Sequence, residues 1–252
     1  MNLSQPKICT LSGNTLKIIA AVSMLLDHIG YLFFPQMIIF RILGRIAFPI
    51  FAFMVAEGCR YTRSKFRYFA TMFTLAFAIQ LVYYFYSKKM TLTVIATFTI
   101  AILLIYGLQS VKAVILDEKS RLFEKLLVVE LFAMSVVAVY VLNQIVSIEY
   151  GFYGCMLPVA ASFLHAPKGN KNSVFEKLDK LSIHILVMGI WLFMMSLQGG
   201  WVQPYSLLAL PLLFLYSGER GNGKLKYFFY IFYPLHLAVL EGLKLLIETV
   251  TK

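Results

Sequence analysis

Residues 16–58 read LKIIAAVSMLLDHIGYLFFPQMIIFRILGRIAFPIFAFMVAEG, which is two apolar runs separated by a short turn at Pro35. Each run is about 20 residues long, the length that an α-helix needs to cross the hydrocarbon core of a membrane. Neither run shows the alternation of apolar and polar residues that is typical of a β-strand. The stretch therefore predicts a hairpin of two transmembrane helices, and it carries charged residues that a bilayer disfavours.

Apolar runs of this kind recur along the whole chain of 252 residues. Hydrophobic residues make up 60% of the chain and charged residues 14%, whereas soluble domains contain about 45–50% and about 25%. Nine runs need roughly 180 residues, which leaves no room for a soluble catalytic, nucleotide-binding or DNA-binding domain. The runs are 15–34, 38–57, 67–86, 91–110, 126–146, 150–164, 181–197, 204–216 and 227–247. The sequence predicts an all-α integral membrane protein, a single bundle of about nine transmembrane helices over residues 1–252.

The basic residues are distributed asymmetrically between the connections. Sixteen lysines and arginines lie in every second connection, whereas the alternate connections and the C-terminus hold three. The sixteen are found in 1–14, 60–67, 111–125, 165–180 and 217–226, and the other three are Lys88, Lys89 and Lys252. The positive-inside rule then places the N-terminus in the cytoplasm and the C-terminus outside. The net charge of +11 follows from these connections, so no nucleic-acid partner is expected.

Four ionisable side chains lie inside the first hairpin, where each costs several kcal/mol. Asp27 and His28 precede the turn, while Arg41 and Arg45 follow it, and helix rise places His28, Arg41 and Arg45 at depths of about 10, 9 and 15 Å. Two guanidiniums beside one carboxylate leave a positive charge that suits an anion or an oxyanion. His28 can transfer a proton near neutral pH. A buried ion pair that only joins the two helices is the alternative interpretation.

The last apolar run carries a second candidate. His236 lies near the membrane midplane, one helical turn from Tyr233, and Pro234 bends the helix between them. Spacing alone leaves a functional and a structural role for His236 equally open.

A further group lies at the cytoplasmic end of the second run. Glu57 ends that run and is followed by Arg60 and Arg63. These arginines are either ordinary cytoplasmic positive charge or a cradle for the phosphates of a cytosolic cofactor.

The histidines do not predict a metal site. The chain holds four, with no i,i+4 pair and no HExxH motif. His165 and His184 border the polar connection 165–180, and their positions in the sequence are only weak evidence for a function.

Four stretches together resemble the TraX family of conjugal-transfer membrane proteins. They are LKIIAAVSMLLDHIGYLF (16–33), RILGRIAFPIFAFMVAEG (41–58), EYGFYG (149–154) and LYSGERGNGKLKYFFYIFYPLHLAVL (215–240). The resemblance covers most of the chain, while 87–145 matches only in hydrophobic character. The named member of that family is associated with N-terminal acetylation of pilin. The family is also distantly similar to multi-span membrane acyltransferases that acetylate surface glycans, in which a membrane histidine with neighbouring arginines is catalytic.

The resemblance implies a role for each matching residue. It places the catalytic histidine at His28 with Asp27 beside it, and the paired arginines at Arg41 and Arg45, while His236 matches a family position without an assigned role. We expect His28 to act as general base or transient acyl carrier, Asp27 to orient or charge-balance it, and the arginines to stabilise the oxyanion.

The resemblance also implies a reaction and a location. We expect a membrane-bound O- or N-acyltransferase that uses cytosolic acetyl-coenzyme A as donor and no metal. The acceptor is a protein N-terminus, a glycan or a small molecule, and the protein is a multi-pass protein among the lipids of a bacterial-type inner membrane.

Two functions of other classes stay open from the sequence. A small-solute or proton-coupled transporter would also need His, Asp and Arg inside the membrane, although no internal repeat supports it. A non-enzymatic assembly protein of a surface-appendage or conjugation system would use the polar cluster only for structure.

Overall fold

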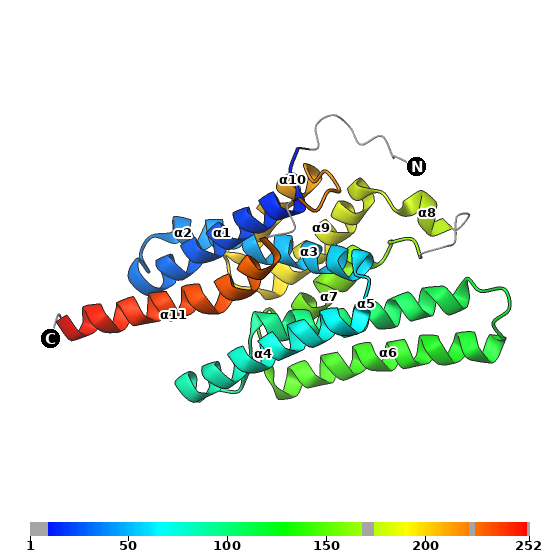
Figure 1. The fold of residues 1–252 in the computed structure, drawn as a ribbon, viewed down its shortest axis with the longest axis horizontal. Helices are drawn as coiled ribbons and strands as arrows, with labels where there is room; N and C mark the ends of the chain where they lie inside the picture. The colour runs from blue at the N-terminus through cyan, green and yellow to red at the C-terminus, as the bar shows by residue number, and fades with distance from the viewer. Residues whose placement is uncertain (1–9, 168–173, 222–224, 251–252) are drawn as a thin grey trace. The chain divides into compact units, whose positions relative to one another are not determined.

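The computed structural model describes residues 10–167, 174–221 and 225–250, almost entirely as helices (Figure 1). Seven helical stretches of the described residues are long and apolar enough to cross a membrane, and one of them, Ile38–Tyr61, consists of two consecutive helices. The prediction of an all-α membrane protein is confirmed. The sixth and eighth predicted runs form shorter helices, so the count of nine crossings and the orientation of the N-terminus stay predictions.

The contacts within the chain divide it into two compact units, residues 1–54 with 192–252 and residues 55–191. Two helices run from one unit into the other, α3 (Ala47–Tyr61) and α9 (Leu181–Gln198). The first unit also contains α1 (Gly13–Phe33), α2 (Ile38–Gly44), the 3-10 helix η1 (Gln203–Leu208), α10 (Ala209–Phe214) and α11 (Lys226–Val250). The second contains α4 (Lys65–Ser87), β1 (Thr91–Leu92), α5 (Val94–Ile115), α6 (Leu122–Ile145), β2 (Ser147–Ile148), α7 (Gly151–Ser162) and α8 (Val174–Leu178).

In the first unit, α1 and α2 pack closely because small residues lie where they meet. A side-chain carbon on Gly30 would collide with Phe40, and one on Gly44 would collide with Asp27. The hydroxyl of Ser23 donates a hydrogen bond of 2.6 Å to a backbone carbonyl of α2. Small residues and hydroxyl hydrogen bonds commonly join helices in membranes. This contact holds the Asp27 side chain directly against α2.

The second apolar run is interrupted between α2 and α3 for a local reason. Pro49 lacks the N–H that would bond the carbonyl of Arg45, and its ring crowds that carbonyl. The helix breaks at that point, since α2 ends at Gly44 and α3 begins at Ala47. Residues 38–61 still form one stretch long enough to span a membrane.

In the second unit, the segment that contains the short helix α7 is bonded to α5 at both ends of α5. At one end β1 pairs in parallel with β2, and the Glu149 carboxylate accepts a hydrogen bond of 2.8 Å from the Val94 N–H at the start of α5. At the other end the Lys112 ammonium donates to the carbonyls of Ser162 and His165, both at 3.1 Å. The segment that contains α7 therefore runs parallel to α5 from one end to the other.

Helix α6 has a different environment from α5. Val139 is its one buried residue among those described, whereas α5 has ten. Helix α5 packs against α4, α6 and α7. An apolar helix with so little buried surface is suited to contact with lipid, so α5 forms the centre of this unit and α6 part of its outer face.

If α7 crosses the membrane, the residues before and after it are accessible from opposite compartments. Ser147 and Lys177 are both exposed, and each can be replaced by cysteine on a background in which the three native cysteines are serine. We expect Ser147→Cys to react with an impermeant thiol reagent in intact cells and Lys177→Cys to react only after the membrane is opened. Labelling of both from the same side would show that α7 enters and leaves by one surface.

Candidate active site

Asp27 of α1 binds two arginines of the second apolar run. Arg41 Nη1 lies 3.0 Å from Asp27 Oδ2, and Arg45 Nη2 lies 3.1 Å from Oδ1 and 3.2 Å from Oδ2. Arg45 is the more buried arginine, with 13% of its side chain exposed against 29% for Arg41. Its Nη1 also lies 3.5 Å from Oε1 of Gln203 in η1. Two guanidiniums and one carboxylate leave a net positive charge, which can stabilise an anion or an oxyanion.

His28 and His236 lie together, with ring centroids 5.0 Å apart in an edge-to-face arrangement. Each Nδ1 lies 2.8 Å from the carbonyl four residues earlier in its own helix, Met24 for His28 and Phe232 for His236. A carbonyl only accepts, so this contact places the proton of a neutral ring on Nδ1 and leaves a lone pair on Nε2. The Nε2 of His236 is buried without a hydrogen-bond partner among the described residues. The pair therefore offers two imidazole bases at one place.

The structure brings the residues predicted from the first hairpin into one unit, and Asp27 contacts the two arginines that the sequence places beside it. Its carboxylate binds Arg41 and Arg45, whereas His28 is oriented by a hydrogen bond that its Nδ1 donates to the carbonyl of Met24. Adjacent residues on an α-helix point about 100° apart, which explains why Asp27 faces α2 while His28 faces His236. Asp27 is thus a partner of the arginines in this geometry.

Residues of the last apolar run surround the imidazole of His236. The ring of Phe232 stacks on it at 5.0 Å, and the ring of Tyr233 lies edge-on at 5.8 Å. Pro234 lies inside α11, which continues past it. The aromatic rings fix the orientation of His236, a residue for which spacing left a structural role equally open.

The expected phosphate cradle at the end of α3 is only partly available. The Arg60 guanidinium donates to both carboxylate oxygens of Asp179, at 3.0 and 2.7 Å. Glu57 is buried, with its Oε1 4.0 Å from Arg60 Nη1 and 3.4 Å from His165 Nε2. Arg63 is exposed, whereas the guanidinium of Arg60, with 30% of its side chain exposed, is already bound to Asp179.

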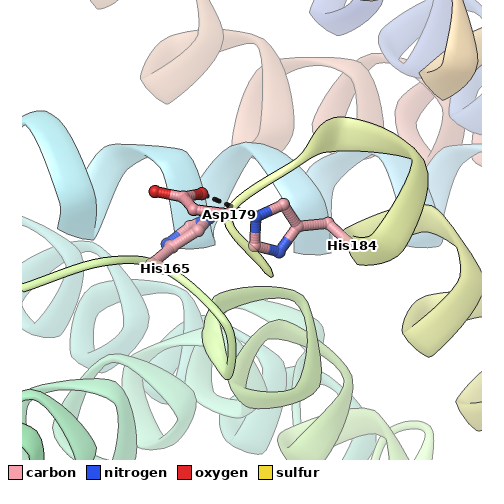
Figure 2. Close-up of side chains that lie close together, drawn as sticks. All are labelled: His165, Asp179 and His184. Carbon is pink, nitrogen blue, oxygen red and sulfur yellow. Dashed lines mark hydrogen bonds and ion pairs between the residues drawn. The ribbon is translucent and has the colours of Figure 1, made fainter. Parts of the chain in front are cut away.

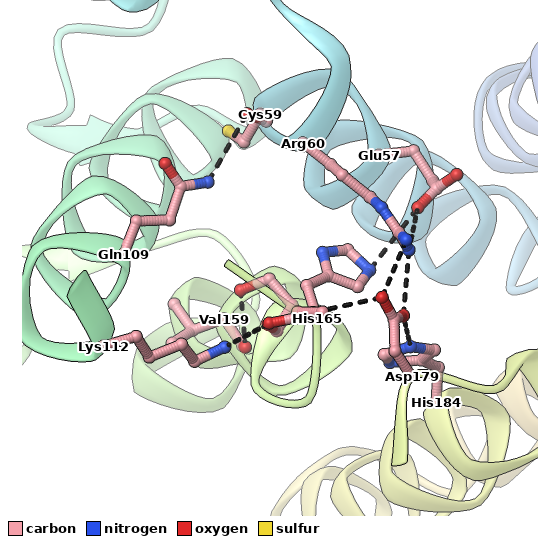
Figure 3. Close-up of polar contacts among 11 residues, drawn as sticks. Glu57, Cys59, Arg60, Gln109, Lys112, Val159, His165, Asp179 and His184 are labelled. Atoms are coloured by element: carbon pink, nitrogen blue, oxygen red, sulfur yellow. Dashed lines mark hydrogen bonds and ion pairs between the residues drawn. The ribbon is translucent and has the colours of Figure 1, made fainter. Parts of the chain in front are cut away.

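The sequence reasoning missed a buried polar cluster around Asp179 (Figure 3). Besides Arg60, this carboxylate accepts hydrogen bonds from Nε2 of His184 at 2.8 Å and from the Ala166 N–H at 3.1 Å. Burial raises the pKa of the Asp179 carboxyl, but these hydrogen bonds and the charge of Arg60 outweigh it and hold the pKa below its usual range. No motif could reveal the cluster, because its members come from separate segments of the chain.

Comparisons with known proteins give one family and two curated relatives. The family model described as TraX protein matches residues 12–244. The chain is 26% identical over 251 residues to the probable fimbrial assembly protein FimC, serogroup H1, of Dichelobacter nodosus, covering 94% of this chain and 97% of that protein. It is 50% identical over 38 residues to the uncharacterized protein RP591 of Rickettsia prowazekii (strain Madrid E), 15% of each chain. No solved structure shows a significant match.

Adding a methyl group at Gly44 should separate α2 from Asp27. The new carbon would overlap the Asp27 carboxylate, so neither ion pair could keep its geometry. We expect Gly44→Ala to lower the Tm of the purified protein measured by differential scanning fluorimetry. Gly242→Ala in α11, where nothing lies within 4 Å, is the matched control and should be neutral or stabilising by up to about 1 kcal/mol. An unchanged Tm for Gly44→Ala would mean that the α1–α2 contact relaxes without cost.

Proposed function

Because this chain belongs to the TraX family, we propose that it is an integral-membrane acyltransferase. It moves an acyl group, in the first place acetyl, from cytosolic acyl-coenzyme A to an amine or hydroxyl acceptor at or across the membrane. The observation that carries the proposal is the His28–His236 pair, in the same unit as a carboxylate that two arginines share. An ion pair with only a structural role does not explain why two imidazoles, each with a lone pair on Nε2, lie together.

The chemistry needs one base and one group that stabilises negative charge. Nε2 of His28 takes the proton from the acceptor N–H or O–H while the acceptor lone pair attacks the thioester carbonyl. The tetrahedral oxyanion is stabilised by the net positive charge of Arg41 and Arg45. The intermediate then expels the coenzyme A thiolate, which takes the proton back from the imidazolium and leaves as the thiol.

His236 has a supporting role in this proposal. Its Nε2 is a hydrogen-bond acceptor with no partner among the described residues, and it lies beside His28. An amine acceptor has a second N–H, which can donate a hydrogen bond to this nitrogen. That hydrogen bond would align the amine lone pair with the thioester. Tyr233 and Phe232 keep the ring of His236 in the required orientation.

Location and donor access complete the proposal. The protein crosses a bacterial-type inner membrane nine times with its N-terminus in the cytoplasm, and the donor binds from the side that carries Arg63. The name of the Dichelobacter nodosus relative, a probable fimbrial assembly protein, supports an acceptor among the proteins of a surface appendage.

A second candidate function is supported by the same relative. A non-enzymatic assembly protein of a fimbrial or conjugation system would also be a membrane protein of this family, and its Asp27 cluster would act only as a clamp between helices. The two candidates differ in what happens when an imidazole is replaced without loss of the fold.

His28→Gln should separate them, because glutamine resembles histidine in size but cannot accept and return a proton. We expect the purified variant to keep the Tm of the wild-type protein and to lose about 100-fold or more in acetyl-coenzyme A turnover, measured as thiol release and label transfer to a peptide amine. Ser196→Ala, which removes a hydroxyl bonded to its own helix, is the control and should keep full turnover. A fully active His28→Gln protein would remove the proposed base, and wild-type protein that supports assembly but releases no thiol would favour the non-enzymatic candidate.

Arg45→Lys and Asp27→Asn should fail in different ways. Lysine keeps the positive charge facing Asp27 but loses the planar fork of donors, so Arg45→Lys should fold and lose most of its turnover. Asp27→Asn leaves two cations without a counter-charge, and breaking a buried pair costs about 3–5 kcal/mol. We therefore expect Asp27→Asn to lower both the Tm and the expression level. Equal behaviour of the two variants in both assays would contradict the separate roles.

A further inference from the structure

A second group of buried titratable side chains lies in the unit of residues 55–191, apart from the residues used for acyl transfer. His165 follows α7, Asp179 follows α8, and His184 lies in the first turn of α9 (Figure 2). One potential ligand atom from each lies within 4.8 Å of the other two. Both imidazoles are more than nine-tenths buried, with exposed fractions of 7% for His165 and 3% for His184.

Three nitrogens of these imidazoles have no hydrogen-bond partner within the described part of the chain. They are Nδ1 and Nε2 of His165 and Nδ1 of His184, and all are shielded from solvent. Glu57 Oε1 approaches His165 Nε2 to 3.4 Å, but this contact lacks hydrogen-bond geometry. A buried polar atom without a partner costs about 1–3 kcal/mol. A neutral imidazole has one N–H and one lone pair, and His184 donates its Nε2–H to Asp179. Nδ1 of His184 and one nitrogen of His165 therefore present two lone pairs to a ligand in this small volume.

The chemistry of the three side chains fits a metal ion, because imidazole nitrogens and carboxylate oxygens are the ligand atoms that such ions bind in proteins. Two imidazoles and one carboxylate form a common ligand set for zinc and neighbouring divalent ions, with a fourth position for water or another ligand.

We propose that His165, Asp179 and His184 bind a divalent transition metal ion of the zinc type. The ion would join the ends of α7 and α8 to the start of α9. Lys112 positions one ligand, since its ammonium donates to the carbonyl of His165. Glu57 lies beside the same imidazole, as carboxylates around metal-binding histidines commonly do.

Arg60 makes the proposal testable because it competes for the same carboxylate. Asp179 already accepts four hydrogen bonds, two of them from the Arg60 guanidinium (Figure 3). An ion that binds Asp179 must displace at least one of these contacts, and the charge of Arg60 opposes it. Removing Arg60 should therefore strengthen metal binding. A purely structural ion-pair cluster would only lose stability.

The experiment uses the purified full-length chain in detergent, stripped with a chelator and titrated with Zn²⁺ by calorimetry and with Co²⁺ by visible absorption. We expect one ion per chain and a Co²⁺ absorption band in the wild-type protein. Asp179→Asn and His184→Gln should each weaken binding by about 100-fold or more, since even outer partners of a metal site contribute about 10–100-fold. Arg60→Gln should bind more tightly than the wild type. Asp117→Asn, an exposed acid of the same unit, should leave binding unchanged.

A second variant at the same position distinguishes the loss of a metal ligand from misfolding of His184→Gln. His184→Cys keeps a ligand atom, so its Co²⁺ complex should gain a sulfur-to-cobalt absorption band in the near ultraviolet that the wild type lacks. The proposal is overturned if the wild type binds no ion, if Asp179→Asn binds as tightly as the wild type, or if Arg60→Gln binds more weakly. Acyl transfer in the other unit does not depend on the outcome.

Discussion

The carboxylate of Asp27, shared between Arg41 and Arg45, is the interaction on which the first unit depends. Guanidiniums within an apolar span are tolerated when a counter-charge and hydrogen-bond acceptors are close, and the bare backbone of Gly44 allows that approach. This contact also positions the other residues of the candidate site. His28 is the next residue along α1, and Arg45 reaches η1 through Gln203.

Backbone carbonyls orient the polar side chains of both units. His28 and His236 each use the carbonyl one turn earlier in their own helix, and Lys112 uses the carbonyls that follow α7. Carbonyls near helix ends and within helices are available to side chains where water is scarce, because backbone polar groups in a membrane must be satisfied within the protein. Backbone carbonyls therefore orient the proposed base in one unit and support a proposed metal ligand in the other.

Much of the fold follows from the sequence, since the length and hydropathy of a run decide whether it can span a bilayer, and the break after Gly44 follows from Pro49. The depth of Asp27, Arg41 and Arg45 along their helices also follows, because helix rise is fixed. Depth does not set the direction in which a side chain points, so helix rise alone does not show that Asp27 faces the arginines while His28 faces His236. The Asp179 cluster could not be predicted from the sequence for another reason. Arg60 lies 119 residues from its partner, and no local pattern encodes such a pairing.

The order of residues in the first hairpin has a consequence for how the protein is made. Asp27 leaves the ribosome before either arginine, so its carboxylate is already beside the translocon when the second apolar run arrives. That run alone would bring two guanidiniums toward lipid, each at about 2.5–3.5 kcal/mol on insertion scales. With α1 in place, the carboxylate of Asp27 offsets one of the two positive charges as the arginines enter. Insertion of the second run should therefore depend on the presence of α1, because α1 carries the counter-charge.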